Sequence, residues 1–350
     1  MNYTRQACIA VLIFLGIFIN LFFHPANAAG YSPKKMTVLG YYAEDYPGDR
    51  LSLNTLSNKQ AVINSVAFFS YLVKENGNLT GKVPEEGVKL AKDKNMKPLL
   101  LVHNVGKYNS RDVIHKVLSV EKNRKNLEKN ILSLVKGNGF KGVNIDFEGV
   151  PAQDRSNYNK LLAELKQMFK PNGYLLTVSI PAKTVDNPSN EWYGAYDYRT
   201  IGKTADLVAV MTYEEHWSGG SPGPVASLPW VQRVLDYSVR NISREKVLMG
   251  IPAYGYDWSA AGNRSVRWNK VGELTSKYGG AQWNNYASSP YLIYYDEKGK
   301  KHEVWFENKY SLGLKLDLAK SYGIGGIAIW RLGFEDASFW ETVSGRGTGH

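Results

Sequence analysis

Residues 140–148 read FKGVNIDFE and alternate apolar residues with polar or small ones. Such alternation predicts a β-strand, because successive side chains of a strand point to opposite faces. One face receives the polar or small series Gly142, Asn144, Asp146 and Glu148. The other face receives Val143, Ile145 and Phe147, which indicates a covering layer of helices. Carboxylates are costly to bury, so the inward pair indicates either a functional site or a hydrogen-bonded structural pair.

Seven further apolar runs accompany this strand and alternate with amphipathic helical stretches. The predicted strands are residues 37–42, 64–71, 97–104, 142–148, 174–181, 206–213, 247–254 and 325–330. Helices are predicted at 84–92, 111–137 with a break near Val120, 154–169, 228–239 and 310–322. This alternation favours parallel βαβ units, and runs that are apolar throughout favour strands covered on both faces. Eight such units predict an α/β fold, a (β/α)8 TIM barrel.

Residues 257–305 interrupt the alternation after the seventh strand. The segment is too long for a loop and is rich in Trp, Tyr, Gly and Asn, so it predicts a small inserted β-rich subdomain. Four tryptophans lie in or beside it, of which we expect about half or more to form its core and the others to be available for stacking on a sugar polymer: Trp258, Trp268, Trp283 and Trp305.

The amino-terminal residues 1–28 have the composition of a secretory signal peptide. Residues 7–23 are almost purely apolar, and the small-x-small pattern at 26–28 predicts cleavage after Ala28. The predicted mature chain, 29–350, then contains no cysteine, because Cys8 is the only one. The alternative is an uncleaved anchor, although the apolar run is slightly short of the ~20 residues of a membrane span. After cleavage we expect no stable membrane association.

Composition excludes several classes of protein. The 350 residues are 43% hydrophobic and 21% charged, which does not fit a disordered or collagen-like chain. The single cysteine excludes a disulfide framework and multi-cysteine metal sites. The GxGxxG at residues 137–142 precedes a predicted strand instead of opening a helix, so dinucleotide binding is not predicted. We expect neither a cofactor nor a metal.

The charge balance points to an anionic partner or environment. There are 43 Lys or Arg against 32 Asp or Glu, a net charge of +11. Such a surplus suits nucleic acid, an acidic membrane surface or an acidic wall polymer. No dense run of Lys or Arg marks a nucleic-acid patch, so nucleic acid is not expected as a partner. We expect a monomer.

The position of Glu148 favours a functional role for the carboxylates. It ends its predicted strand at the carboxyl side, where barrel enzymes place their active sites. His103 and Asn104 end the third strand near the same rim, and we expect the histidine to have a structural role there.

Segment 142–148 resembles the DGxDxDxE signature of glycoside hydrolase family 18, with Gly142, Asp146 and Glu148 matching. Residues 211–213 (MTY) look like the strand-six motif of that family, and 327–330 (IAIW) look like its strand-eight motif. The resemblance covers almost the whole mature chain, and the inserted segment is similar to the small α+β insertion of many members.

The similarity is greatest to the catalytic domains of spore cortex-lytic and YaaH-like N-acetylglucosaminidases, through 142–148, 179–183 (SIPAK) and 211–217 (MTYEEHW). Two positions depart from the family pattern, because Lys141 and Asn144 replace its first and middle aspartates. We expect Asn144 to donate a hydrogen bond to an ionised Asp146 instead.

The resemblance implies substrate-assisted hydrolysis, in which the 2-acetamido group of the sugar is the nucleophile. Glu148 would protonate the leaving oxygen and then activate water, and Asp146 would orient the acetamido N–H. Tyr213 would hold the acetamido carbonyl. The residues that we expect to bind substrate are Asn144, Met211, Trp330, Tyr41 and Glu214. A core role remains open for Tyr213 and Trp330, as does a solvated loop position for Glu214.

These observations lead to one principal hypothesis and several alternatives. The principal one is a secreted retaining hydrolase of β-1,4-linked N-acetylglucosamine glycan, either peptidoglycan or spore cortex fragments, associated with the cell wall or spore. The nearest alternative is a chitinase or chito-oligosaccharide hydrolase. A non-catalytic lectin on the same fold is a third possibility. A membrane-tethered interaction protein would require an uncleaved amino terminus and does not explain the inward carboxylates.

Overall fold

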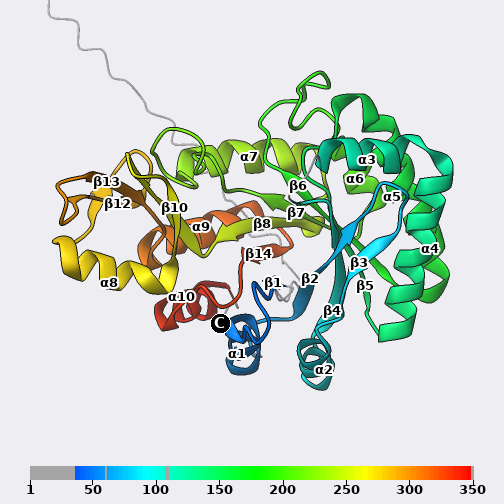
Figure 1. Cartoon of the computed structure of the whole chain (residues 1–350), viewed down its shortest axis with the longest axis horizontal. Helices are drawn as coiled ribbons and strands as arrows, with labels where there is room; N and C mark the ends of the chain where they lie inside the picture. Colours follow the sequence, from blue (N-terminus) through cyan, green and yellow to red (C-terminus); the bar gives the residue numbers. More distant parts are fainter. Residues whose placement is uncertain (1–35, 60, 107–109, 348–350) are drawn as a thin grey trace, which may run out of the picture. The chain divides into compact units, whose positions relative to one another are not determined.

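The computed structural model describes residues 36–59, 61–106 and 110–347, so the predicted signal segment 1–28 lies outside the described residues. Eight parallel strands close into a barrel in the order β1-β14-β8-β7-β6-β5-β4-β2, with β1 also paired to β2 (Figure 1). Their bounds are β1 (Thr37–Tyr42), β2 (Ser65–Val73), β4 (Lys97–His103), β5 (Gly142–Asp146), β6 (Leu175–Pro181), β7 (Leu207–Met211), β8 (Val247–Pro252) and β14 (Gly326–Trp330). The predicted TIM barrel is therefore confirmed.

Helices connect successive strands and cover the outside of the barrel (Figure 1). They are α1 (Leu51–Asn58), α2 (Glu85–Asp93), α3 (Ser110–Ser119), α4 (Glu121–Asn138), α5 (Arg155–Phe169), α6 (Tyr198–Thr204), α7 (Leu228–Asn241) and α9 (Lys309–Tyr322), and α10 (Ala337–Gly347) follows the last strand. Short 3-10 turns η1 (Ala152–Asp154), η2 (Lys170–Asn172) and η3 (Arg244–Lys246) precede a helix or a strand. The break near Val120 is confirmed, because that residue has extended backbone between α3 and α4. Within the described residues, no helix combines the length and apolarity that a membrane span requires.

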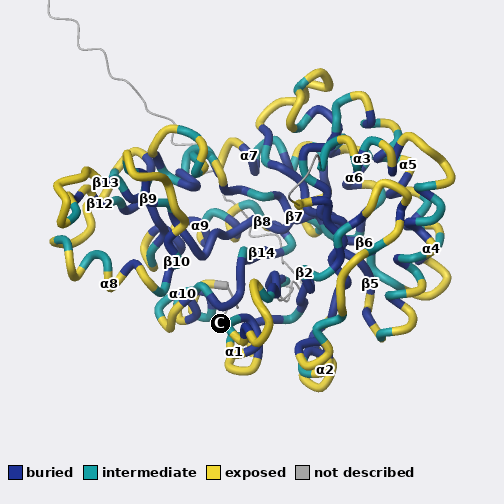
Figure 2. Tube along the Cα trace, in the orientation of Figure 1, coloured by how far each residue is buried: buried dark blue, intermediate teal, exposed yellow. Residues whose placement is uncertain are grey.

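Strand β5 shows how the barrel separates its two faces. Val143, Ile145 and Phe147 are fully buried in the cluster that packs against the helices, as the alternation predicted. A smaller apolar cluster fills the inside of the barrel: Leu39, Tyr41, Ala67, Leu99, Leu101, Ala209, Leu248 and Ala328. Buried residues accordingly make up most of the length of the barrel strands (Figure 2). The strand ends at Asp146, two residues before the predicted end, so Glu148 lies in the loop that follows.

The predicted insertion is a five-stranded antiparallel sheet in the order β10-β9-β13-β12-β11 with one helix. Its elements are β9 (Tyr254–Ser259), β10 (Arg264–Arg267), α8 (Trp268–Tyr278), β11 (Gln282–Asn284), β12 (Ser289–Tyr295) and β13 (Lys301–Trp305). It follows the seventh barrel strand directly. Of its tryptophans, Trp258, Trp268 and Trp305 are buried and only Trp283 is exposed. The small hairpin strand β3 (Leu79–Gly81) extends β2 at the carboxyl end of the barrel.

Candidate active site

A cavity of about 800 Å³ opens at the carboxyl ends of the barrel strands. Seven of the eight residues predicted for the site line it: Tyr41, Asp146, Glu148, Met211, Tyr213, Glu214 and Trp330. Asn144 is the exception. None of the four insertion tryptophans lines this cavity. The structure therefore gives no support to the expectation that some of them stack on a sugar polymer in this cavity.

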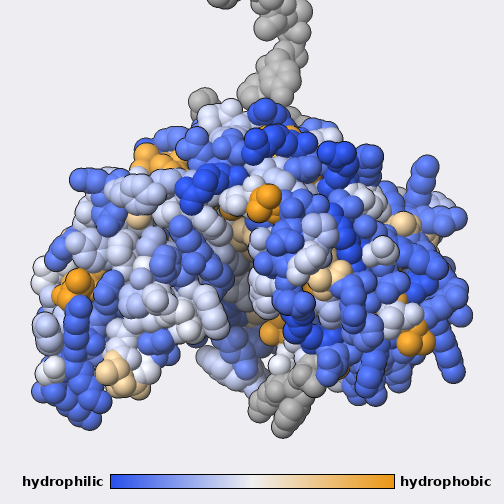
Figure 3. Space-filling view, turned by 90° about the horizontal axis from the view of Figure 1, so that it is seen from above, coloured by the Kyte–Doolittle hydropathy of each residue, from blue (hydrophilic) through white to orange (hydrophobic). Residues whose placement is uncertain are grey.

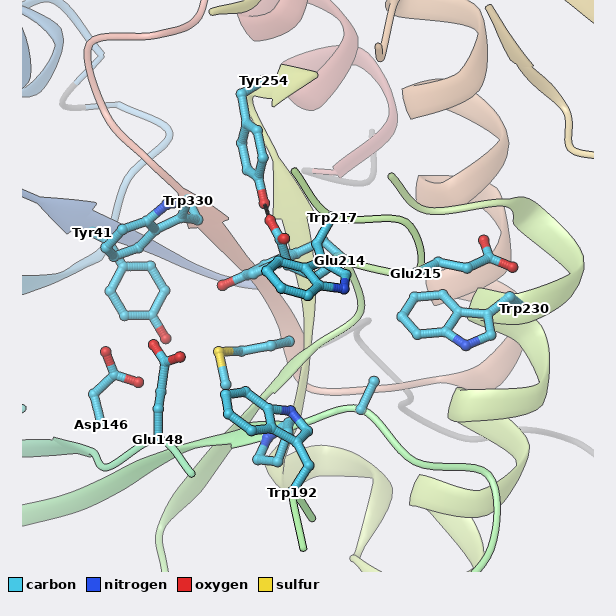
Figure 4. A pocket seen from close by; sticks show the side chains of 14 residues that line it. Tyr41, Asp146, Glu148, Trp192, Glu214, Glu215, Trp217, Trp230, Tyr254 and Trp330 are labelled. Carbon is cyan, nitrogen blue, oxygen red and sulfur yellow. Dashed lines mark hydrogen bonds between the residues drawn. The ribbon is translucent and has the colours of Figure 1, made fainter. Parts of the chain in front are cut away.

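The two carboxyl groups of the predicted motif point into the cavity side by side, toward the hydroxyl group of Tyr41 (Figure 4). Asp146 is the last residue of β5 and is 4% exposed, and its Oδ1 has no hydrogen-bond partner. Burial raises the pKa of Asp146 well above its usual value, and the nearby charge of Glu148 adds to this effect. Burial also raises the pKa of Glu148, with a further contribution from Glu214. Both groups therefore keep a proton to higher pH than an exposed carboxyl group would.

Asn144 lies beneath the cavity and not in its wall. Its Nδ2 donates to Thr177 Oγ1 at 3.0 Å, and its Oδ1 accepts from Ser179 Oγ at 3.0 Å. Ser179 Oγ is in turn 2.7 Å from the hydroxyl of Tyr41. The predicted hydrogen bond from Asn144 to an ionised Asp146 is thus replaced by bonds to β6. The reason is register, because Asn144 pairs directly with Thr177 across the two strands.

The main chain of Glu148 is held by the side chain of Asn104. The N–H of Glu148 donates to Asn104 Oδ1 and Asn104 Nδ2 donates to the carbonyl oxygen of Glu148, both at 2.7 Å. The β4–β5 ladder ends with the pair His103 and Asp146. The buried amide of Asn104 therefore continues the ladder by one more step after the strand has ended. It fixes the backbone of Glu148 without touching its carboxyl group.

Trp330 ends β14 and is held by two rings. Tyr41 and Phe69 contact it nearly edge to face, with ring centroids 5.4 and 5.5 Å away. Phe69 also stacks on His103 at 4.0 Å. Burial lowers the pKa of His103 to about 4, so this histidine is neutral near pH 7 and packs as an aromatic ring. His103 does not line the cavity, which agrees with the structural role expected for it.

Glu214 links the barrel to the insertion at the cavity wall. It follows Tyr213 and adopts a left-handed backbone, with φ of 66°. Its carboxylate accepts hydrogen bonds from the hydroxyls of Tyr254 and Tyr256 in β9, the latter at 2.8 Å (Figure 4 shows the former). Burial raises the pKa of Glu214, and these two hydrogen bonds partly oppose the effect. The insertion thus supplies part of one wall, through Tyr254.

Tyr213 is 9% exposed and packs against Gly250 of β8. A Cβ atom at Gly250 would lie 2.8 Å from the ring of Tyr213, so glycine is needed there for the ring to reach the cavity. Burial raises the pKa of Tyr213 well above its usual value, which keeps its hydroxyl a hydrogen-bond donor.

Three tryptophans of the cavity were not predicted. Trp192 and Trp217 are 53% and 56% exposed, and Trp230 lies in the first turn of α7. Trp192 lies over Gly149, the residue after Glu148, and Trp217 lies against Gly219. Trp192 and Trp217 lie in loops that follow the fifth and sixth predicted strands. Their position in loops after the carboxyl ends of barrel strands is the feature of the sequence that could have predicted them as site residues. Periodicity could not, because isolated loop residues have none.

The site therefore combines two carboxyl groups that line the cavity, those of Asp146 and Glu148, with a tyrosine hydroxyl and several aromatic side chains. Groups of this kind can transfer protons to a bound molecule whose rings lie against the aromatic side chains. Among the described residues, no three His, Cys, Asp or Glu side chains are grouped so that they could hold a metal ion.

Comparisons with known proteins show what the chain is similar to. The model of glycosyl hydrolases family 18 matches residues 37–335. The uncharacterized glycosylase YvbX of Bacillus subtilis is 36% identical over 95% of this chain and 97% of its own length. The cortical fragment-lytic enzyme of Bacillus anthracis is 31% identical over 84% of this chain and 72% of its own length.

Solved structures show the same relationship. The Bacillus cereus spore cortex-lytic enzyme SleL aligns with a TM-score of 0.84 and 28% identity, covering 90% of this chain and 74% of that one. A chitinase from Chromobacterium violaceum aligns with a TM-score of 0.84 and 31% identity, covering 90% and 99%. The chain is therefore a glycoside hydrolase that belongs to glycosyl hydrolases family 18.

Proposed function

We propose that this glycosidase is secreted and cleaves β-1,4 bonds of an N-acetylglucosamine-containing glycan, namely peptidoglycan or spore cortex fragments, with retention of configuration. The observation that carries the proposal is the placement of Asp146 and Glu148 side by side in a cavity with Trp330. Similarity to a cortical fragment-lytic enzyme and to SleL supports the choice of glycan. We further propose that the protein acts as a monomer at the cell wall or spore, with no nucleic-acid partner and no stable membrane association.

The proposed reaction has two steps. In the first, Glu148 donates its proton to the glycosidic oxygen, the bond from that oxygen to C1 breaks, and the acetamido oxygen of the same sugar bonds to C1. The positive oxazolinium ion that results is stabilised by Asp146 as a carboxylate. In the second, the Glu148 carboxylate takes a proton from water as its oxygen attacks C1, and the bond from C1 to the acetamido oxygen breaks. Two inversions at C1 give net retention.

The surrounding residues position the sugar. Tyr213 would donate a hydrogen bond to the acetamido oxygen, and Trp330 would lie under the sugar ring. Met211 and Glu214 would line the same subsite, with Tyr41 next to the two carboxyl groups. Asn144 would act from below, by holding Tyr41 through Ser179.

The experiment that tests this function is product analysis by mass spectrometry on peptidoglycan, spore cortex fragments and chitin in parallel. We expect products with N-acetylglucosamine at the new reducing end from peptidoglycan or cortex fragments, and early products in the β-configuration by proton NMR. Products with an α-configuration at the earliest time points would exclude the retaining mechanism. No turnover of any of these glycans would favour the lectin alternative.

A chitinase is the second candidate function. It is favoured by one observation, the alignment of the Chromobacterium violaceum chitinase over 99% of its length. Faster turnover of chitin or chito-oligosaccharides than of cortex fragments in the same experiment would support it.

Asn104→Ala is expected to lower kcat by roughly 10- to 100-fold and leave KM nearly unchanged, because a displacement of a reacting group by about 1 Å can cost ~10²-fold. The change removes both hydrogen bonds that fix the backbone of Glu148. Steady-state kinetics on a soluble oligosaccharide provide the measurement.

Asn64 offers a matched control. It also holds a neighbouring backbone through both amide atoms, since Val38 N–H donates to its Oδ1 and its Nδ2 donates to Met36 O, each at 3.1 Å. That contact lies at the amino-terminal end of the barrel. Asn64→Ala should therefore cost stability and leave kcat unchanged. Equal losses of kcat in the two variants would mean that Asn104 acts only on stability.

A further inference from the structure

Positive charge gathers at the amino-terminal end of the barrel, opposite the cavity. Six segments there lead from helices into strands: 92–97, 136–141, 170–174, 203–206, 240–246 and 320–325. Together they contain eleven Lys or Arg and three Asp or Glu, a surplus of eight positive charges in a chain whose whole surplus is eleven. These six segments are called the base.

The cations of the base are available to a partner. Ten of the eleven are exposed, and across the described part of the chain none of these ten is in an ion pair: Lys92, Lys94, Lys97, Lys136, Lys141, Lys170, Lys203, Arg240, Arg244 and Lys320. Two of the three acids are already paired with lysines outside the base, Asp93 with Lys89 and Asp206 with Lys166.

The segments of the base form one continuous arc. They precede β4, β5, β6, β7, β8 and β14, which are consecutive neighbours in the barrel. The N–H of Gly325 donates to Arg244 O, so segments 320–325 and 240–246 are in contact. Lys141 bonds through its N–H to Pro98 O and through its carbonyl to Leu175 N–H, and these two residues directly follow the neighbouring segments 92–97 and 170–174. Neighbouring strands are ~4.8 Å apart, well within the Debye length of ~10 Å at 0.1 M salt. The fields of neighbouring cations therefore add.

Helix dipoles explain only part of this charge. The five cations in the last turns of α2, α4, α6, α7 and α9 do complement helix carboxyl termini. Helix dipoles would favour acidic residues in the first turn of each helix as strongly as basic residues in the last turn. The first turns of α5, α6, α7 and α9 nevertheless contain no acidic residue. Lys97 begins a strand and Lys141 precedes one, where no helix end requires a cation.

Four of the loops at the opposite end of the barrel are rich in acids. Four loops at the carboxyl ends of the strands, 43–50, 147–154, 182–197 and 212–227, hold ten Asp or Glu and two Lys or Arg. Several of these acids are paired, since Asp186 contacts Arg155 and Lys183, and Glu191 contacts Arg111. These loops therefore differ from the base in offering a polyanion no surplus of positive charge. The face of the molecule seen in Figure 3 is mostly hydrophilic, with small scattered apolar spots.

We propose that the base binds a phosphodiester polymer of the cell wall and so retains the enzyme beside its glycan without occupying the cavity. The identity of this partner rests on the proposed function. Eight of the ten exposed cations are lysines. Lysine acts as a flexible point charge, which suits a polymer of fixed negative charges, whereas planar bidentate recognition would favour arginine.

The test compares the mature chain with two variants that each lose four charges. The base variant carries Lys97→Gln, Lys141→Gln, Lys170→Gln and Lys203→Gln. The control variant carries the same change at four exposed lysines outside the base: Lys122, Lys129, Lys160 and Lys309. Sedimentation with purified wall sacculi, before and after chemical removal of their phosphodiester polymers, measures binding at several salt concentrations. Turnover of a soluble oligosaccharide is measured in parallel.

We expect the base variant to bind intact sacculi at least about tenfold more weakly than the parent, and the control variant to change little. Binding of the parent should weaken with salt and fall on stripped sacculi, while turnover is equal in all three proteins. Equal loss in both variants, undiminished binding to stripped sacculi, or preference for DNA or anionic vesicles over intact sacculi would each overturn the proposal. Absence of turnover in all three proteins would instead count against the proposed function, because binding is scored separately.

Discussion

Glu148→Gln is expected to lower kcat on a natural glycan by roughly 10³- to 10⁴-fold, at the upper end of what one acid–base group contributes. One carboxyl group supplies both proton transfers in the proposed reaction, so its amide can replace neither. Since burial and Glu214 raise the pKa of Glu148, the protonated form that starts the reaction persists to higher pH, and the parent rate should fall only as pH rises through that pKa. The variant should lose this alkaline limb, which a pH profile of kcat/KM would reveal.

Stability provides the control for this variant. The folded chain binds a proton at Glu148 more tightly than the unfolded chain, so this group makes the fold less stable as pH rises from the unfolded pKa of ~4.3 toward the folded value. Replacing it by a neutral amide removes that cost. The variant should therefore melt no lower than the parent at pH 7, and any gain should vanish below about pH 4. Activity within tenfold of the parent, in a folded variant, would contradict the role of Glu148.

An aryl glycoside separates the two roles of Glu148. A phenolate with a low pKa leaves without protonation, so the variant should lose much less of the first step on such a substrate. A burst of the phenol followed by slow turnover would place the remaining defect in the attack of water.

The barrel could be predicted from sequence because its signals are local. Each buried strand is a short apolar run, and β5 adds an alternation that assigned the faces of Val143 and Asp146 correctly. Helices α1 and α6 are short and have no predicted counterpart, α8 lies in the insertion whose composition predicts β-structure, and α10 follows the last predicted strand. The predicted strand reaches Glu148, beyond the end of β5 at Asp146, because the sequence does not show that the side chain of Asn104 takes the place of a paired strand there.

The residues of the candidate site that belong to a sequence motif or to a strand end could be predicted. The residues that only the folded barrel brings together from distant loops could not. Seven motif or rim residues converge on one cavity, but Trp192 and Trp217 come from irregular loops whose positions depend on the closed barrel. Asn144 illustrates a different limit. The spacing along one strand predicts Asp146 as its partner, whereas the register between strands brings Thr177 and Ser179 within hydrogen-bonding distance.

Asp146→Asn is expected to lower kcat by roughly 10²- to 10³-fold, the usual cost of removing one group that stabilises transition-state charge. The amide can still accept a hydrogen bond from the acetamido N–H, but it cannot carry the negative charge that would balance the oxazolinium ion. The loss should therefore be greater for sugars with a 2-acetamido group than for matched aryl glycosides with a 2-hydroxyl group. Kinetics on the two aryl glycosides, with the parent measured alongside, provide the comparison.

Asp154→Asn is the matched control, because Asp154 is also a buried aspartate but lies outside the cavity, where it contacts His115 Nδ1 at 2.7 Å. That variant should lose stability and keep its kcat. Asp146→Asn should instead lose kcat and keep its stability. Burial raises the pKa of Asp146, so a neutral amide removes the cost of ionising this group in the folded chain. An equal loss of kcat on both aryl glycosides would argue against participation of the acetamido group, and would leave Asp146 as a general electrostatic partner of Glu148.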